Sequence, residues 1–159
     1  MAAVTVATPS DRAIVMTRDF AAPRALVFRA WTEPGLVERW YGAHGWDVVS
    51  AEVDLRVGGA WRFVWAGPDG AGMAAGGVYR EIDAPARLVY TEAFDDAWYP
   101  GRSLVTHDLT ERDGTTTLST TFLFESRRVR DLVIESPMER GVAEGYDRLD
   151  AVLSALENM

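Results

Sequence analysis

The chain has 159 residues and a formal net charge of −8 at pH 7, from 16 basic and 24 acidic residues. Its length fits one domain, and its acidic balance argues against a surface that binds nucleic-acid phosphates. The chain has no cysteine, which excludes disulfides, thiolate metal sites and cysteine nucleophiles. It also has no lysine, which excludes a Schiff base on a lysine side chain.

The N-terminal sequence does not resemble a signal peptide, because a basic start and a long apolar segment are both missing. No apolar run approaches the ~18 residues of a membrane-spanning helix. We therefore expect a cytoplasmic protein that binds neither membranes nor nucleic acid. Six Trp, five Tyr and six Phe indicate either a thick aromatic core or an aromatic-lined cavity.

The first predicted elements are a strand and two short helices. The alternation of side chains over residues 12–20 is typical of a strand. Residues 22–32 have one apolar face and an early proline, which predicts a helix. Residues 33–42 form a second, shorter helix that begins near a proline and ends at a glycine. We expect residues 1–11 to be disordered or frayed.

Six further strands and one long helix follow. Turn signals separate segments of alternating side chains. The predicted strands span residues 46–55, 60–66, 73–82, 87–94, 102–111 and 116–125. The final helix is expected over 137–157, with Ser136 as N-cap, Pro137 in the first position and Glu139 completing a capping box. The arginine-rich stretch at 126–131 is interpreted as a solvated face beside a loop.

This order of elements predicts one sheet wrapped around the last helix. Six consecutive hairpin-linked strands indicate an antiparallel sheet. One helix cannot cover a flat seven-stranded sheet, so the sheet must curl. The expected fold class is α+β: a curved seven-stranded antiparallel sheet around a long C-terminal helix, with two short helices between the first two strands. We assign residues 12–157 to this single domain.

Four segments carry a family resemblance, in order and at the right separations. They are "LVFRAWTEPGLVERWYG" (26–42), "DLRVGGAWRF" (54–63), "GVYREIDAPARLVYTEAF" (77–94) and "PMERGVAEGYDRLDAVL" (137–153). They resemble the activator of heat-shock-protein-90 ATPase homologue-like family, in the START-like, birch-pollen-allergen-like (SRPBCC) superfamily. The resemblance implies the helix-grip fold, with a deep cavity between the concave sheet and the C-terminal helix. It does not fix the function, because the superfamily includes lipid carriers, polyketide cyclases and aromatases, and hormone receptors.

Candidate ligand-binding residues are those that strand phase and helical spacing direct toward this cavity. At Tyr79 the phase has an alternative, which would point Val78, Arg80 and Ile82 inward. The loop that contains Trp98 and the tyrosine after it is a candidate lid. The candidate ligand-binding residues are Trp40, Trp61, Phe63, Trp65, Tyr79, Tyr90, Glu92, Phe94, Trp98, His107, Thr120, Phe122, Met138, Gly141, Val142 and Gly145.

Gly141 and Gly145 lie one turn apart on the face of the final helix that looks toward the sheet. Each helical glycine costs roughly 1 kcal/mol relative to alanine. One explanation is that they set the roof of the cavity together with Val142, where many members of the resembling family carry a tryptophan. The other is a close approach of helix and sheet through small residues, which would leave no void.

Three polar residues, Glu92, His107 and Thr120, fall on the inward face of consecutive strands. We expect them to form a polar band across the aromatic cavity. Burial would raise the pKa of Glu92, and a nearby protonated His107 would lower it. The band could bind a polar group of a ligand or shuttle a proton. Alternatively, Glu92 and His107 satisfy each other or reach solvent. We expect no metal site, because His44 and His107, the only histidines, come from distant segments.

Three functions follow from these expectations. The favoured one is non-enzymatic binding of a hydrophobic or polyaromatic small molecule, for carriage, sequestration or protection, as in natural-product metabolism. The second is a cofactor-independent enzyme of the polyketide cyclase or aromatase type, with His107 and Glu92 as catalytic acid and base. The third is a co-chaperone that stimulates an ATPase. We expect no cofactor, and a monomer or homodimer. A filled interior, with no cavity of ~300 Å³ or more, would remove the first two functions and leave an interaction protein.

Overall fold

The computed structural model describes residues 3–96 and 99–158. Its strands are β1 (Thr5–Ala7), β2 (Ala13–Phe20), β3 (Asp47–Val53), β4 (Ala60–Ala66), β5 (Gly72–Asp83), β6 (Arg87–Phe94), β7 (Ser103–Arg112) and β8 (Thr115–Leu123). Its helices are α1 (Arg24–Thr32), α2 (Pro34–Trp40), α3 (Arg127–Ile134) and α4 (Met138–Glu157), with a 3₁₀ turn, η1 (Pro68–Gly70). Within the described ranges, no helix is long and apolar enough to cross a membrane.

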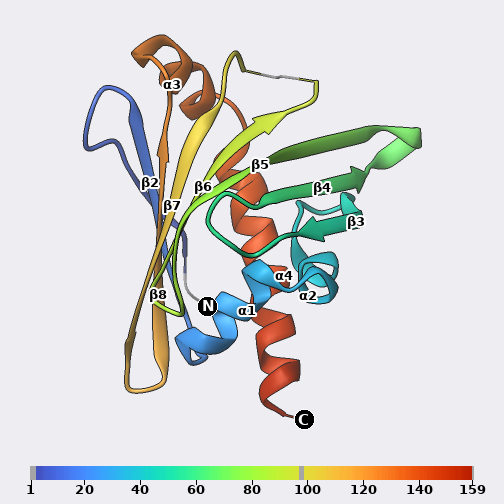
Figure 1. Ribbon diagram of the computed structural model, residues 1–159, viewed down its shortest axis with the longest axis vertical. Helices are drawn as coiled ribbons and strands as arrows, with labels where there is room; N and C mark the ends of the chain where they lie inside the picture. The colour runs from blue at the N-terminus through green and yellow to red at the C-terminus, as the bar shows by residue number, and fades with distance from the viewer. Residues whose placement is uncertain (1–2, 97–98, 159) are drawn as a thin grey trace.

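The strands form one antiparallel sheet in the order β1-β2-β8-β7-β6-β5-β4-β3. The strands from β3 to β8 form a meander, and β2 joins its far side by pairing with β8. Figure 1 shows the sheet curving around α4, with α1 and α2 beside the middle of that helix and α3 near its N-terminal end. This arrangement confirms the predicted α+β helix-grip fold and the two short helices between β2 and β3.

The sheet has eight strands rather than the seven predicted, because residues 5–7 form an edge strand. This strand, β1, pairs with β2, from Thr5 opposite Thr17 to Ala7 opposite Val15. Its central valine packs against a small apolar cluster between β2 and α3. Three residues are too few for side-chain periodicity to be recognised. Part of the segment that we expected to be frayed is therefore a strand.

The inward phase predicted for β4 and β5 is confirmed. Trp61, Phe63 and Trp65 are all buried and belong to the main hydrophobic core. Tyr79 on β5 is buried in the same core. A bulge directly after Tyr79 shifts the pairing with β6 by one residue. Ile82, from the alternative phase, therefore also packs against this core.

Helix α3 was not predicted, and it occupies the arginine-rich stretch. Ser126 caps it by accepting a hydrogen bond from the Val129 backbone N–H at 3.2 Å. Val129 and Val133, one turn apart, are buried in the cluster beside β2. Arg130 is almost fully buried and donates to the Ser10 carbonyl at 2.7 Å. The expectation of a solvated arginine face holds for Arg127 and Arg128, which are exposed. It is wrong for Arg130 and for the loop, because the valine pair anchors a helix.

Helix α4 begins at Met138, and the predicted capping box does not form. Pro137 occupies the N-cap position and offers no side-chain hydrogen bond. The Ser136 hydroxyl donates to the Val133 carbonyl at the end of α3 and accepts a bond of 3.3 Å from the Met138 N–H. The turn between the two helices is short, so Ser136 also serves the C-terminal end of α3, where carbonyl groups lack helical partners.

Arg18 fastens β2 to α4. Its side chain is 1% exposed, and its guanidinium lies 3.1 Å from the Asp147 carboxylate and 3.7 Å from that of Asp150. The guanidinium also lies over the Phe20 ring, 5.0 Å from the centroid. A buried cation needs such counter-charges. These contacts therefore hold the helix at one position on the sheet.

Candidate functional site

A cavity of about 240 Å³ lies between the inner face of the sheet and the N-terminal half of α4. Helices α1 and α2 contribute to one wall, and α3 contributes to another. Nine lining residues are aromatic, and Glu92 is the one charged residue of the lining within the described ranges. The site is therefore an aromatic chamber with a single carboxyl group.

The structure brings part of the predicted set to this cavity. The predicted residues in its lining are Trp40, Trp65, Glu92, Phe94, Phe122, Met138, Gly141, Val142 and Gly145. Outside its lining, in the packed core, are Trp61, Phe63, Tyr79, Tyr90, His107 and Thr120. Trp98 lies outside the described residues.

The first two helices explain why part of the concave face is filled. The Tyr41 ring, just after α2, packs on Phe63 with centroids 5.6 Å apart. The Trp31 ring of α1 covers His107 at 4.1 Å. Strand phase identifies a face of the sheet, but it cannot identify which part of that face a helix covers.

Several lining residues were not in the predicted set. They are Trp31, Tyr41, Gly42, Ala43, Met73, Tyr99, Phe124, Val133 and Tyr146. Tyr146 carried a usable signal, because it follows Val142 by four residues and so lies on the same helix face. Tyr99 had been proposed as part of a lid, and it is buried. The residues of α1 and of the 41–43 loop carried no such signal, because their place depends on how these segments pack.

Glu92 is a buried carboxyl that faces the cavity. Its residue is 6% exposed, and it lines the cavity from β6. Within the described residues, no hydrogen bond or ion pair reaches its carboxyl group. Burial raises the pKa of Glu92 to about 7, because a low-dielectric surrounding disfavours the ionised form. Near neutral pH this side chain exists in both protonation states.

His107 is neutral and fully hydrogen-bonded in the core. Its Nε2 lies 2.8 Å from the Tyr90 hydroxyl, and its Nδ1 lies 2.8 Å from the Thr120 hydroxyl. Burial lowers the pKa of His107 to about 3. A neutral imidazole donates through one nitrogen and accepts through the other, so both nitrogens are occupied. The arrangement stabilises the core and leaves no ring nitrogen for a ligand.

The expected polar band does not form, because the strand register separates its members. In the β6–β7 pair, His107 lies opposite Leu88, whereas Glu92 lies opposite Ser103. Four residues along a strand correspond to about 13 Å. Thr120 does lie beside His107. Glu92 is therefore isolated from both, and neither pairing with His107 nor a shared proton is possible in this structure. Among the described residues, no group of three or more His, Asp or Glu could hold a metal ion.

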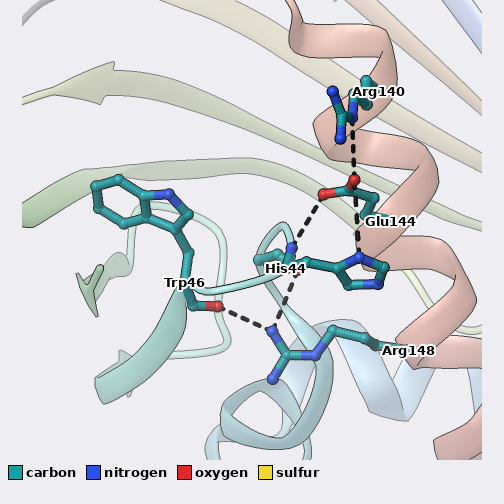
Figure 2. Close-up of polar contacts among 6 residues, drawn as sticks. His44, Trp46, Arg140, Glu144 and Arg148 are labelled. Carbon is teal, nitrogen blue, oxygen red and sulfur yellow. Dashed lines mark hydrogen bonds and ion pairs between the residues drawn. The ribbon is translucent and has the colours of Figure 1, made fainter. Parts of the chain in front are cut away.

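A loop over residues 42–46 closes one side of the cavity, and polar contacts tie it to α4 (Figure 2). The Glu144 carboxylate accepts hydrogen bonds from the His44 backbone N–H at 3.1 Å and from Arg140 at 3.2 Å. Arg148 donates to the Trp46 carbonyl at 2.8 Å and to the Gly42 carbonyl at 3.3 Å. These contacts hold the loop against the helix, although the His44 ring itself is largely exposed.

The two helix glycines face this loop rather than the sheet. A Cβ at Gly145 would lie 3.5 Å from the Gly42 carbonyl oxygen, and one at Gly141 would lie 3.8 Å from the Ala43 Cβ. Both glycines also line the cavity. A Cβ at either position would make only ordinary van der Waals contact, so a close approach does not require the glycines. The explanation that remains is the first one: the missing side chains leave open space in the cavity beside α4.

Comparison with known proteins identifies relatives of this chain. The family model described as "Activator of Hsp90 ATPase homolog 1-like protein" matches residues 21–154. No curated protein matches the chain. Among solved structures, a protein from Rhodobacter sphaeroides is 30% identical, with 96% of this chain and 99% of that one covered and a TM-score of 0.91.

Two further solved structures have the same fold. A protein from Arthrobacter aurescens is 26% identical, with 95% of this chain and 91% of that one covered and a TM-score of 0.84. An AHSA1-like protein from Aeromonas hydrophila is 23% identical, with 86% and 92% covered and a TM-score of 0.67. The last match is informative about the fold alone.

Proposed function

Because the chain belongs to the activator of Hsp90 ATPase homolog 1-like family, we propose that the protein binds a small hydrophobic molecule in the aromatic cavity. One observation carries the proposal: in the described part of the chain, nine aromatic residues line the cavity together with one buried carboxyl that has no hydrogen-bond or ion-pair partner. Concave, mostly apolar sites with few polar groups are typical of small-molecule binding. Carriage, sequestration or protection of that molecule is the corresponding task.

The volume of the cavity limits the ligand. The cavity volume of about 240 Å³ is below the ~300 Å³ named above, which is the lower end of the range for pockets that bind drug-sized ligands. The interior is nevertheless open, with aromatic side chains on several sides. A ligand with one ring or a short branched chain fits this volume better than the polyaromatic molecule first expected. An origin in natural-product metabolism remains a prediction.

The two other functions have less support. A cyclase would need an acid or base at the ligand, but His107 lies outside the cavity lining and both of its nitrogens are bonded. Glu92 alone would have to serve both roles. The co-chaperone function rests on the family description, and no feature of the described surface adds to it.

Native mass spectrometry of the protein, purified from extract of its own cells, tests the proposal. We expect a bound small molecule in the wild type and none in Val142→Trp, because the indole would fill space that Gly141 and Gly145 leave beside it. For an added neutral aromatic probe, 2-phenylethanol, the substitution should weaken binding by about tenfold or more, equivalent to about 1.4 kcal/mol.

The matched control is Ala151→Trp, which adds the same side chain to an exposed position of α4. It should bind like the wild type. Circular dichroism should show both variants folded. A wild type that carries no small molecule and does not bind 2-phenylethanol would contradict the proposal. Equal losses in the two tryptophan variants would place the binding elsewhere.

A further inference from the structure

We propose that the ligand carries a positively charged amine, held between the Glu92 carboxylate and the aromatic rings of the cavity. This inference rests on the proposed function, because it names the chemical class of ligand for the same cavity. It follows from three features of the described lining: a carboxyl without a partner, nine aromatic residues, and the lack of any cation.

The Glu92 carboxyl has no partner among the described residues in either protonation state. As a carboxylate it is buried without a counter-charge, and as a carboxylic acid its hydroxyl has no acceptor among the described residues. Buried polar groups without partners are unfavourable. An ammonium group supplies both hydrogen-bond donors and positive charge. A hydroxyl supplies a donor but no charge, and an anionic ligand would be repelled.

The aromatic residues around Glu92 favour a cation for a second reason. The face of an aromatic ring is electronegative and attracts cations within about 6 Å of its centroid. The Tyr41 ring stacks on Trp40 at 4.9 Å and lies 5.4 Å from Trp65. The centroids of Phe94 and Tyr99 lie 5.9 Å apart. All five rings line the same cavity as Glu92, so an ammonium group bound there lies among aromatic side chains.

Among residues 3–96 and 99–158, the titratable neighbours of Glu92 are uncharged near neutral pH. The titratable groups that interact with it are Tyr41 after α2, Tyr90 on its own strand and Tyr99 from the following loop. Burial raises the pKa of all three, so they stay neutral. From α4, Tyr146 also stays neutral, because burial raises its pKa to about 12. Of these groups, Glu92 is therefore the one whose negative charge can pair with a positively charged ligand.

The test compares two probes that differ in one group. 2-Phenylethylamine is charged at pH 7.5, since alkyl amines of the lysine type have a pKa near ~10.4, whereas 2-phenylethanol has a hydroxyl at the same position. Isothermal titration calorimetry should show the amine binding the wild type about tenfold or more tightly than the alcohol. Glu92→Gln should remove this preference, so that the ratio of the two affinities falls to about twofold or less.

The control variant is Glu38→Gln, which removes the same charge from an exposed position on α2 and should keep the preference for the amine. If the wild type binds the alcohol as tightly as the amine, the inference is wrong and the proposed function stands. The same holds if Glu92→Gln keeps the preference for the amine. If neither probe binds the wild type, the inference and the proposed function both fail.

Discussion

Replacement of Glu92 by glutamine should stabilise the protein, and the gain should depend on pH. Burial raises the pKa of Glu92 from its ordinary 4.5 to about 7. The folded state therefore keeps a proton that the unfolded chain releases, and the stability that this proton contributes is complete below pH 4.5 and lost as the pH rises through about 7. At about 1.36 kcal/mol per pKa unit, the loss is about 3 kcal/mol.

Glutamine has nearly the same shape as glutamic acid and does not ionise, so the variant avoids this loss. Its free energy of unfolding should match that of the wild type at about pH 4 and exceed it by about 3 kcal/mol at about pH 8. For a chain of this size the gap corresponds to roughly 6–12 °C in Tm.

The comparison between variant and wild type is needed because His107 acts in the opposite direction. Burial lowers the pKa of His107 from 6.5 to about 3, so its contribution to stability is lost as the pH falls below 6.5. The wild-type profile alone would mix the two groups. The difference between Glu92→Gln and the wild type isolates Glu92, because His107 is present in both.

Urea unfolding followed by tryptophan fluorescence, at several pH values between about 4 and 8, measures this difference. The exposed-site control, Glu38→Gln, should show no gap that grows with pH. A gap for Glu92→Gln that is constant across the range would refute the reasoning, because it would mean that the carboxyl is hydrated in the folded protein. An equal gap in the control would assign the effect to net charge.

Two further predictions concern the contacts of α4. Gly141→Ala should raise the free energy of unfolding by about 0.5–1 kcal/mol, because the new Cβ meets nothing closer than the Ala43 Cβ at 3.8 Å; a lower Tm would contradict this. Arg18→Met should cost about 1 kcal/mol or less, because it leaves only half-exposed carboxylates behind. Asp147→Asn combined with Asp150→Asn should lower the free energy of unfolding by about 3 kcal/mol, because it leaves a buried guanidinium unpaired. If urea unfolding shows the same loss for Arg18→Met and for the double variant, the Arg18 guanidinium is not desolvated.

The sequence was sufficient to predict most of the fold. Local periodicity identified every strand from β2 to β8 and the faces of Trp61, Phe63 and Trp65, because side-chain alternation is a property of the strand itself. It failed for β1, which is too short to show a period. It also missed α3, although Val129 and Val133 have helical spacing, because the arginine-rich stretch was interpreted as a solvated face beside a loop. The capping-box pattern assigned Ser136 as the N-cap of α4, because the sequence does not show that the same hydroxyl donates to a carbonyl at the end of α3.

The position of the cavity was decided by the tertiary structure. Periodicity put Glu92 and His107 on one face, but the register of β6 and β7 separates them by four residues, and register depends on contacts between distant segments. Trp31 then covers His107, while Glu92 lines the cavity. The sequence by itself determined which residues face inward. Only the packing of α1, α2 and the 42–46 loop against the sheet and α4 decided which of them border open space.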